Sequence, residues 1–175
     1  MAITISGNGI TSANIADGTI TNADINASAA IDGSKISGDF GKVLQVLYDK
    51  QTGSQTIATT TYTDTNLSIT ITPSSTSSKI LVMANVMAAL NGGEGFGVNI
   101  VRGSTNILTT NQNYAVYAGS ISGDKIREWL PISFLDSPST TSATTYKIQV
   151  ASYASNTIEI AEAGPLTMVV MEIGA

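Results

Sequence analysis

Isoleucine recurs every five residues near the start of the chain, and this period restricts the fold more than any other feature of the sequence. The six positions, with a one-residue slip after the fourth, are Ile10, Ile15, Ile20, Ile25, Ile31 and Ile36. In an α-helix five residues advance about 500°, so successive isoleucines would lie about 140° apart and form no continuous stripe. In a flat strand an odd period places successive isoleucines on opposite faces. The spacing therefore predicts neither an amphipathic helix nor a half-buried strand.

Two regular arrangements of this segment remain, a pentapeptide solenoid that bends at every repeat and a chain that winds around sister copies. Six repeats would complete little more than one coil of a solenoid, and stacked repeats need at least about three units to form a core. Burial of six isoleucines in one copy does not offset the entropy lost on ordering the segment. We therefore predict that these isoleucines form an oligomer interface. A disordered Ser/Thr/Asn-rich leader is the alternative, although a flexible linker needs no regular spacing.

The rest of the chain predicts short strands separated by turn-forming residues. The expected strands are 43–48, 55–62, 67–72, 79–90, 97–102, 106–109, 114–121, 126–135, 145–153, 157–160 and 166–173. Many short strands with Gly, Pro, Asn and Asp between them are typical of a sandwich. We predict an all-β protein, in which residues 1–41 form an extended isoleucine-repeat shaft or anchor and residues 42–175 form an antiparallel, jelly-roll-like β-sandwich.

Three apolar stretches need a separate interpretation. Residues 80–90 are rich in Met, Ala and Leu and would also suit a buried helix, but Ile80, Val82 and Val86 share the face that a strand would bury. The nearly continuous apolar run around Val170 resembles a central strand that is covered on both sides. Trp129 lies in a run with other apolar residues, so we expect it to pack in the core.

Composition excludes several chemistries. The chain has no Cys and no His, which removes disulfides, thiolate nucleophiles, the usual general base and the commonest transition-metal ligand. A net charge of −5 argues against nucleic acid, whose binding depends on Lys and Arg. No apolar run approaches the roughly 20 residues that span a bilayer, and no secretory signal is visible. We expect no enzyme, no metal, no cofactor, no nucleic acid and no membrane insertion.

Polar clusters in the sequence have simple structural interpretations. We expect Asp124, Lys125, Arg127 and Glu128 to form a solvated turn and strand edge, where charge discourages edge pairing. Residues 91–97 are rich in glycine but lack the Lys-Ser/Thr of a phosphate-binding loop, and we expect a flexible loop there. The Asp-Gly pairs at 17–18 and 32–33 lack the acid spacing of a calcium loop and are read as turns.

Two parts of the sequence resemble one family. Residues 15–25 (IADGTITNADI) and 30–36 (AIDGSKI) resemble the isoleucine-punctuated repeats in tail fibre and other virion fibre proteins of tailed bacteriophages, of the marine and cyanobacterial type. The second part is similar to the β-sandwich that ends those chains, through residues 41–46, 71–73, 77–82, 102–105 and 166–173. Together these stretches extend over nearly the whole chain.

Membership of that family would imply a homotrimeric virion protein that is made in the host cytoplasm. Its repeat segment would serve as the shaft and bind other virion proteins, and its distal sandwich would be a candidate for contact with a host-surface glycan. Typical fibres have a longer shaft and an adaptor domain, so a capsid decoration or head-fibre protein, whose leader orders on the shell, is the alternative. A glycan-degrading spike needs paired carboxylates in a groove, which the sparse acids here do not favour.

Overall fold

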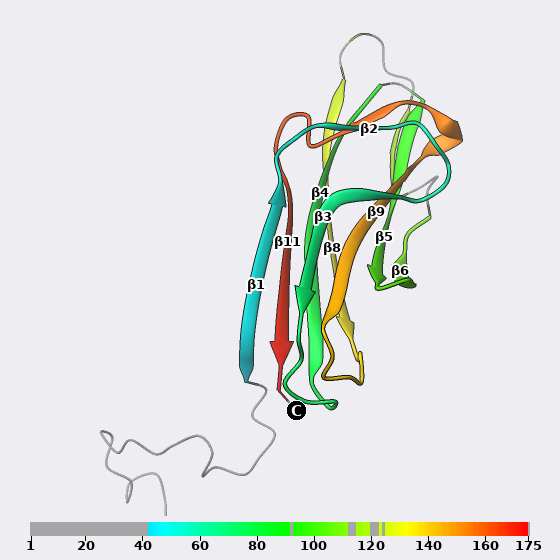
Figure 1. Cartoon of the computed structure of the whole chain (residues 1–175). Coiled ribbons are helices and arrows are strands. Elements are labelled where there is room, and N and C mark those ends of the chain that lie inside the picture. Colours follow the sequence, from blue (N-terminus) through cyan, green and yellow to red (C-terminus); the bar gives the residue numbers. More distant parts are fainter. Residues whose placement is uncertain (1–41, 92, 112–114, 120–122, 124, 175) are drawn as a thin grey trace, which may run out of the picture. The chain divides into compact units, whose positions relative to one another are not determined.

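The computed structural model describes residues 42–91, 93–111, 115–119, 123 and 125–174 (Figure 1). All six isoleucines of the predicted interface, Ile10 to Ile36, lie outside the described residues. The predicted division into residues 1–41 and 42–175 therefore stays a prediction. Within the described part, no helix is long and apolar enough to span a membrane.

Eight long strands and three short ones make up the described part. The long strands are β1 (Val43–Gln51), β3 (Thr63–Ile71), β4 (Lys79–Leu90), β5 (Glu94–Arg102), β6 (Thr105–Thr109), β8 (Ile126–Asp136), β9 (Thr144–Ser152) and β11 (Leu166–Ile173). The short strands are β2 (Gln55–Ile57), β7 (Val116–Ala118) and β10 (Ile158–Ile160), and one 3-10 turn spans Tyr153–Ser155. Each of the eleven predicted strands corresponds to one of these, which confirms the all-β prediction.

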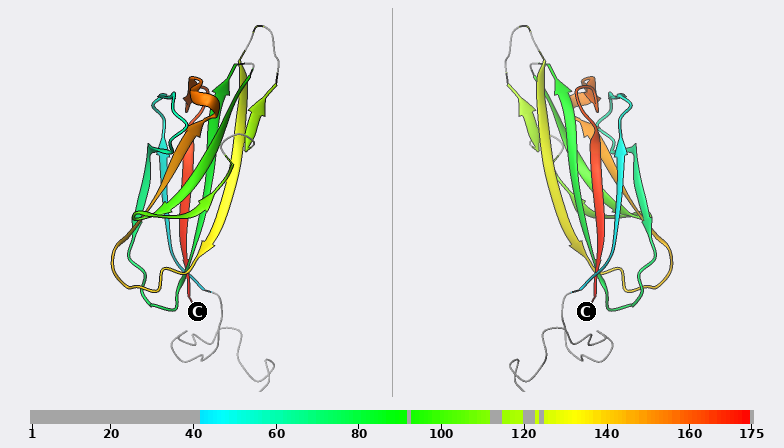
Figure 2. Two further views of the ribbon diagram at one scale, coloured as in Figure 1. Left: turned by 90° about the vertical axis from the view of Figure 1, so that its right-hand side faces the viewer. Right: turned by 90° about the vertical axis from the view of Figure 1, so that its left-hand side faces the viewer.

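The strands pair into two antiparallel sheets (Figures 1 and 2). In sheet A the order of the long strands is β1-β11-β4-β8. The short strand β10 pairs with the end of β4, along the same edge of β4 as β11, and β2 pairs with β10. In sheet B the order is β3-β9-β5-β6, with β7 beside the start of β5. Two packed sheets of four long strands in these orders form a jelly roll, as the sequence predicts.

Alternating side chains place one face of each sheet in a shared core. In β3, Leu67, Ile69 and Ile71 are buried while the residues between them are exposed. β9 follows the same pattern with Tyr146 and Ile148. Residues 79–90, which could have formed a helix, are strand β4, and the inward side chains alternate from Ile80 to Val86. The period of two therefore decides both the element and the face that it buries.

The buried carboxylate of Asp136 connects strands that are distant in sequence. Asp136, at the end of β8, accepts two hydrogen bonds of 2.8 Å from the Nη1 atom of Arg102 in β5 and one of 2.7 Å from the hydroxyl of Tyr146 in β9. Burial and the neighbouring carboxylate raise the pKa of Tyr146, so its hydroxyl stays protonated as a donor. Because β8 belongs to sheet A and the other two strands to sheet B, this cluster joins the two layers.

Residues 91–97 differ from the flexible loop that the sequence predicts. Strand β5 begins at Glu94, and residues 94–96 pair with β7 while 96–102 pair with β9. A Cβ atom at Gly95 would lie 2.7 Å from the carbonyl oxygen of Val116. Gly95 therefore permits close approach of β5 and β7, and Gly93 adopts the positive φ of a turn.

Candidate functional site: the outer face of sheet A

Sheet A turns one face to the core, and its outer face carries apolar side chains in register across four strands. The antiparallel pairings define three rows, each read from β1 through β11 and β4 to β8. The first row is Val46, Met171, Leu81 and Leu135. The second is Tyr48, Val169, Met83 and Ser133, and the third is Lys50, Thr167, Asn85 and Pro131. We call these three rows the apolar outer face.

The borders of the apolar outer face are open to solvent. On β1, Val46 is 54% exposed and Tyr48 is 59% exposed, and on β8 Leu135 is 56% exposed. The side chains on the two central strands are half-buried by their neighbours in the same face. A depression of about 370 Å³ lies over the middle of the face, where β11, β4 and β8 run side by side. The first two rows contain no charged residue.

The same side of sheet A is covered further along β4 by the chain that connects β10 to β11. Met87 is fully buried although its side chain belongs to the outer side, next to its cross-strand partner Trp129. A Cβ atom at Gly164 would lie 2.6 Å from the Trp129 ring, so the connection packs directly on the indole. The amide of Ala161 also donates to the carbonyl of Met87 at 3.1 Å. The apolar outer face thus ends where this connection begins.

Trp129 corrects one prediction. Its side chain is 45% exposed and does not lie in the core. The inward residues of β8 are at even positions, including Leu130 and Phe134, whereas Trp129 is at an odd position and points to the outer side. Side chains alternate in a strand, so proximity in sequence to core residues places an odd-numbered neighbour on the opposite face.

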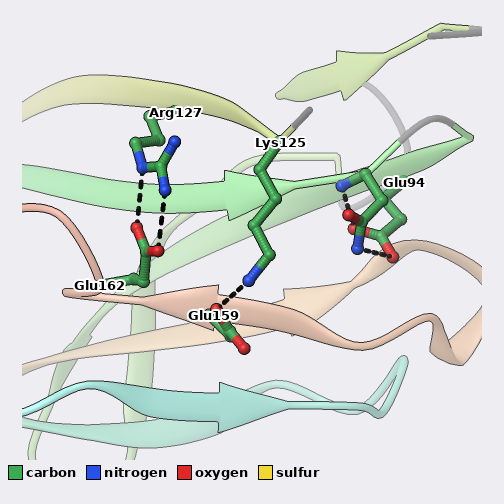
Figure 3. Close-up of polar contacts among 6 residues, drawn as sticks. Glu94, Lys125, Arg127, Glu159 and Glu162 are labelled. Atoms are coloured by element: carbon green, nitrogen blue, oxygen red, sulfur yellow. Dashed lines mark hydrogen bonds and ion pairs between the residues drawn. The ribbon is translucent and has the colours of Figure 1, made fainter. Parts of the chain in front are cut away.

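Two ion pairs join the start of β8 to β10 and to the connection that follows β10 (Figure 3). Ala89 in β4 pairs with Arg127 on one side and with Glu159 on the other. Arg127 donates to both carboxylate oxygens of Glu162 at 2.9 Å, which lowers the pKa of that carboxyl. Lys125 donates to Glu159. Arg127 and Glu128 are exposed, as predicted for a charged strand edge. Lys125 and Arg127 also form specific ion pairs across β4. Asp124 lies outside the described residues.

Glu94, shown beside these pairs in Figure 3, is a buried carboxylate that the sequence analysis missed. It accepts hydrogen bonds from the backbone amide of Asn91 at 2.5 Å and from its side-chain amide at 3.2 Å. These contacts close the tight turn between β4 and β5. Glu94 is therefore part of the turn.

Edge strand β1 is fixed to the sandwich at the point where residues 1–41 lead into it. Glu172 in β11 is fully buried and accepts hydrogen bonds from Gln45 at 2.5 Å and from the amide and hydroxyl of Ser74 at 2.7 and 2.6 Å. Burial opposes its charge, but these donors lower the pKa of Glu172 to about 2. The amide of Gly174 donates to the carbonyl of Lys42 at 2.8 Å. The start of β1 is thus held in place.

The structure also corrects the prediction that β11 is covered on both sides. Its inward residues, including Met168 and Val170, are fully buried, while Val169 and Met171 are only half-buried on the outer face. The inward side chains of this apolar run pack in the core against sheet B. No described residue forms a layer over its outer half. Sequence reasoning named no interface residue on the sandwich, although apolar residues at both odd and even positions of β4 and β11 were the available signal.

Comparison with known proteins gives only distant likenesses. No family model matches the sequence, and no relative is found among curated proteins. Among solved structures, the chain is similar to a structure of the Gx strain of infectious bursal disease virus (TM-score 0.43, 11% identity, 74% of this chain and 38% of that one). It is also similar to a mutant VP2 protein of that virus in derived particles (0.43, 10%, 85% and 40%) and to its viral particle (0.44, 12%, 76% and 38%). This chain thus spans less than half the length of those chains.

Proposed function

We propose that this chain is a structural protein of a virus particle, a short homotrimeric tail fibre with the isoleucine repeat as its shaft. The observation that carries the proposal is the five-residue isoleucine period, because it leads directly into β1, the edge strand of a jelly roll. A segment with this period cannot bury its isoleucines in a helix or a flat strand of one copy. Winding around sister copies is the arrangement that shields every isoleucine.

The trimeric state and the virion context come from the resemblance to phage fibre proteins. In that arrangement the shaft binds other virion proteins, and the sandwich is the candidate contact for a host-surface glycan. A fibre of this kind needs rigid, well-packed domains rather than a reaction centre. The two-layer sandwich with its inter-sheet carboxylate cluster meets that need.

A capsid decoration or head-fibre protein is the second candidate, and the small number of isoleucine repeats favours it. Six repeats make a short shaft, and such a segment could order on a shell as an arm. Labelling the protein in intact particles separates the two candidates. A signal on the tail alone supports the fibre, whereas a signal spread over the head supports decoration.

Assembly of the full chain is tested by light scattering at micromolar concentration. We expect the mass of three chains of 18.0 kDa. We also expect the double variant Ile20→Asp and Ile25→Asp to be monomeric with an intact sandwich, because a charge at a shared apolar axis is strongly unfavourable. A monomeric parent chain, or a double variant that assembles as well as the parent, would contradict the proposal.

A further inference from the structure

The first two rows of the apolar outer face consist mostly of large apolar side chains and have no cover within the described residues. Val169 and Met171 belong to a strand whose sequence is that of one buried on both faces. Large exposed side chains stand at both borders, Val46 and Tyr48 on β1 and Leu135 on β8. Large contiguous apolar patches on soluble proteins mark interaction sites. A second layer of protein is therefore expected on this face.

We propose that the apolar outer face is an interface between copies of this chain. This proposal rests on the proposed function, in that it requires the full chain to assemble. It adds a second contact, in the sandwich itself, to the contact predicted for the isoleucine repeat.

The position of β1 favours a second copy as the occupant. Residues 1–41 lead into Lys42 and Val43, and β1 is the border strand of the apolar outer face. When the repeats of several copies wind together, the first residues of their β1 strands are held at a high effective concentration. The hydrogen bonds of Glu172 with Gln45 and Ser74 fix β1 to the rest of sheet A. Wound repeats would thus tether the sandwiches of neighbouring copies next to β1, which is the border strand of this face.

The chain's own leader fits this face poorly. Its isoleucines recur at an odd spacing, so an extended leader would turn every second isoleucine away from a flat sheet. A glycan also fits poorly, because sugars need hydrogen-bonding partners and the first two rows offer only the hydroxyls of Tyr48 and Ser133. The uncharged and mostly apolar surface of the first two rows is complementary to another surface of the same kind.

The area of the face agrees with an interface that works together with the repeat. Four strands about 4.8 Å apart and three rows about 6.8 Å apart give a flat face of roughly 400 Å². A standard interface buries about 800 Å² on each partner. The face alone would therefore associate weakly, and the repeat would supply the remaining affinity by linkage.

The absence of cysteine from the chain allows a direct test with single cysteines. Val46→Cys and Leu135→Cys place a thiol at each border of the face, and Ser68→Cys places a matched control on the exposed side of β3 in sheet B. Each is made in the full chain and in the background of Ile20→Asp with Ile25→Asp. The rate of thiol alkylation by a maleimide is measured at micromolar concentration, together with the mass by light scattering.

We expect Val46→Cys and Leu135→Cys to react about tenfold or more slowly in the assembled full chain than in the repeat-disrupted background, because a packed interface must open before reagent enters. Ser68→Cys should react at the same rate in both. An assembled chain in which Val46→Cys and Leu135→Cys react as fast as in the disrupted background would overturn this inference and leave the proposed function standing. A monomeric parent chain would overturn both, and protection that persists in a monomer would identify the leader as the cover.

Discussion

The two outer faces of the sandwich differ in chemistry although the two inner faces are alike. On sheet B, two cross-strand rows read from β3 to β6 are Ser68, Lys147, Val101 and Asn106, and Asp64, Gln149, Asn99 and Thr109. The corresponding rows of sheet A contain Val46, Met171, Leu81 and Leu135, and Tyr48, Val169, Met83 and Ser133. The outer rows of sheet B are therefore mainly polar, with Val101 and Asn99 on β5 buried, whereas the two rows of sheet A are mainly apolar and are open to solvent at their borders.

The polar side chains of sheet B bond to one another. Asp64 accepts hydrogen bonds of 2.6 Å from Lys147 and from Gln149, and these donors lower the pKa of its carboxyl. Asn99 extends the network to Gln149 at 3.4 Å. Most of these polar side chains are paired with one another, although the buried Oδ1 atom of Asn99 has no hydrogen-bond partner among the described residues. The comparison shows that alternation determines which residues form the core, whereas the chemistry of the outward residues indicates what each outer face contacts.

The largest effect that tests this comparison comes from two adjacent valines in β11. Val170 is fully buried on the inner face and Val169 is half-buried on the outer face. We expect Val170→Asp to destabilise the sandwich by about 4 kcal/mol or more, because it buries an unpaired carboxylate. Val169→Asp should cost the fold about 1 kcal/mol or less while weakening assembly.

Urea unfolding followed by circular dichroism, with light scattering on the folded protein, measures both quantities. Equal loss of stability in the two variants would mean that the outer side of β11 is as much a part of the monomer's core as the inner side.

An intermediate effect concerns the attachment of β1, the border of the apolar outer face. Glu172→Gln should cost about 1–3 kcal/mol near neutral pH, because the buried acceptor of Gln45 and Ser74 is altered. The folded pKa of about 2 lies below the ordinary value of 4.5, so the contribution of Glu172 is present above pH 4.5 and is lost as pH falls toward 2.

Urea titrations between pH 7 and pH 2 check this sign. The parent chain should lose stability relative to Glu172→Gln across the acidic window. A constant difference between the two proteins would show that the ionisation of Glu172 does not contribute.

The smallest effect separates the covered part of the outer side from the open part. Gly164→Ala should destabilise by about 1 kcal/mol, because the added methyl would meet the Trp129 ring at 2.6 Å and either the ring or the connection between β10 and β11 must shift. The matched control is Gly53→Ala, where a Cβ atom would have no neighbour within 4 Å. The control should change stability by less than about 1 kcal/mol. Thermal unfolding of both variants measures the difference, and similar melting temperatures would mean that Trp129 is not held by this connection.

Most of the fold was predictable because it depends on the period of two. The bounds of β4 and β11 agree with the predicted strands, and the alternation of Leu67, Ile69 and Ile71 identified the inner face of β3. The core position predicted for Trp129 is wrong because Trp129 is at an odd position of β8, whereas the core residues of that strand are at even positions. Local patterns identify strands and their faces when the odd or even position of each residue is taken into account.

The candidate interface was only partly predictable, since it depends on which strands become neighbours. Val46, Met171, Leu81 and Leu135 come from four separate strands, and only the sheet order brings them into one row. The hydrogen bonds of Asp136 with Arg102 and Tyr146 likewise depend on the packing of two sheets. No local pattern contains that information. The isoleucine repeat is the opposite case, since its period is local and its prediction awaits an assembled structure.

An experimentally determined structure of the assembled full chain tests the central claim most directly. The account predicts that Val46, Val169 and Met171 of one copy lie within about 4 Å of apolar side chains of a neighbouring copy. A structure in which these side chains face solvent, or are covered by residues 1–41 of their own copy, would contradict it.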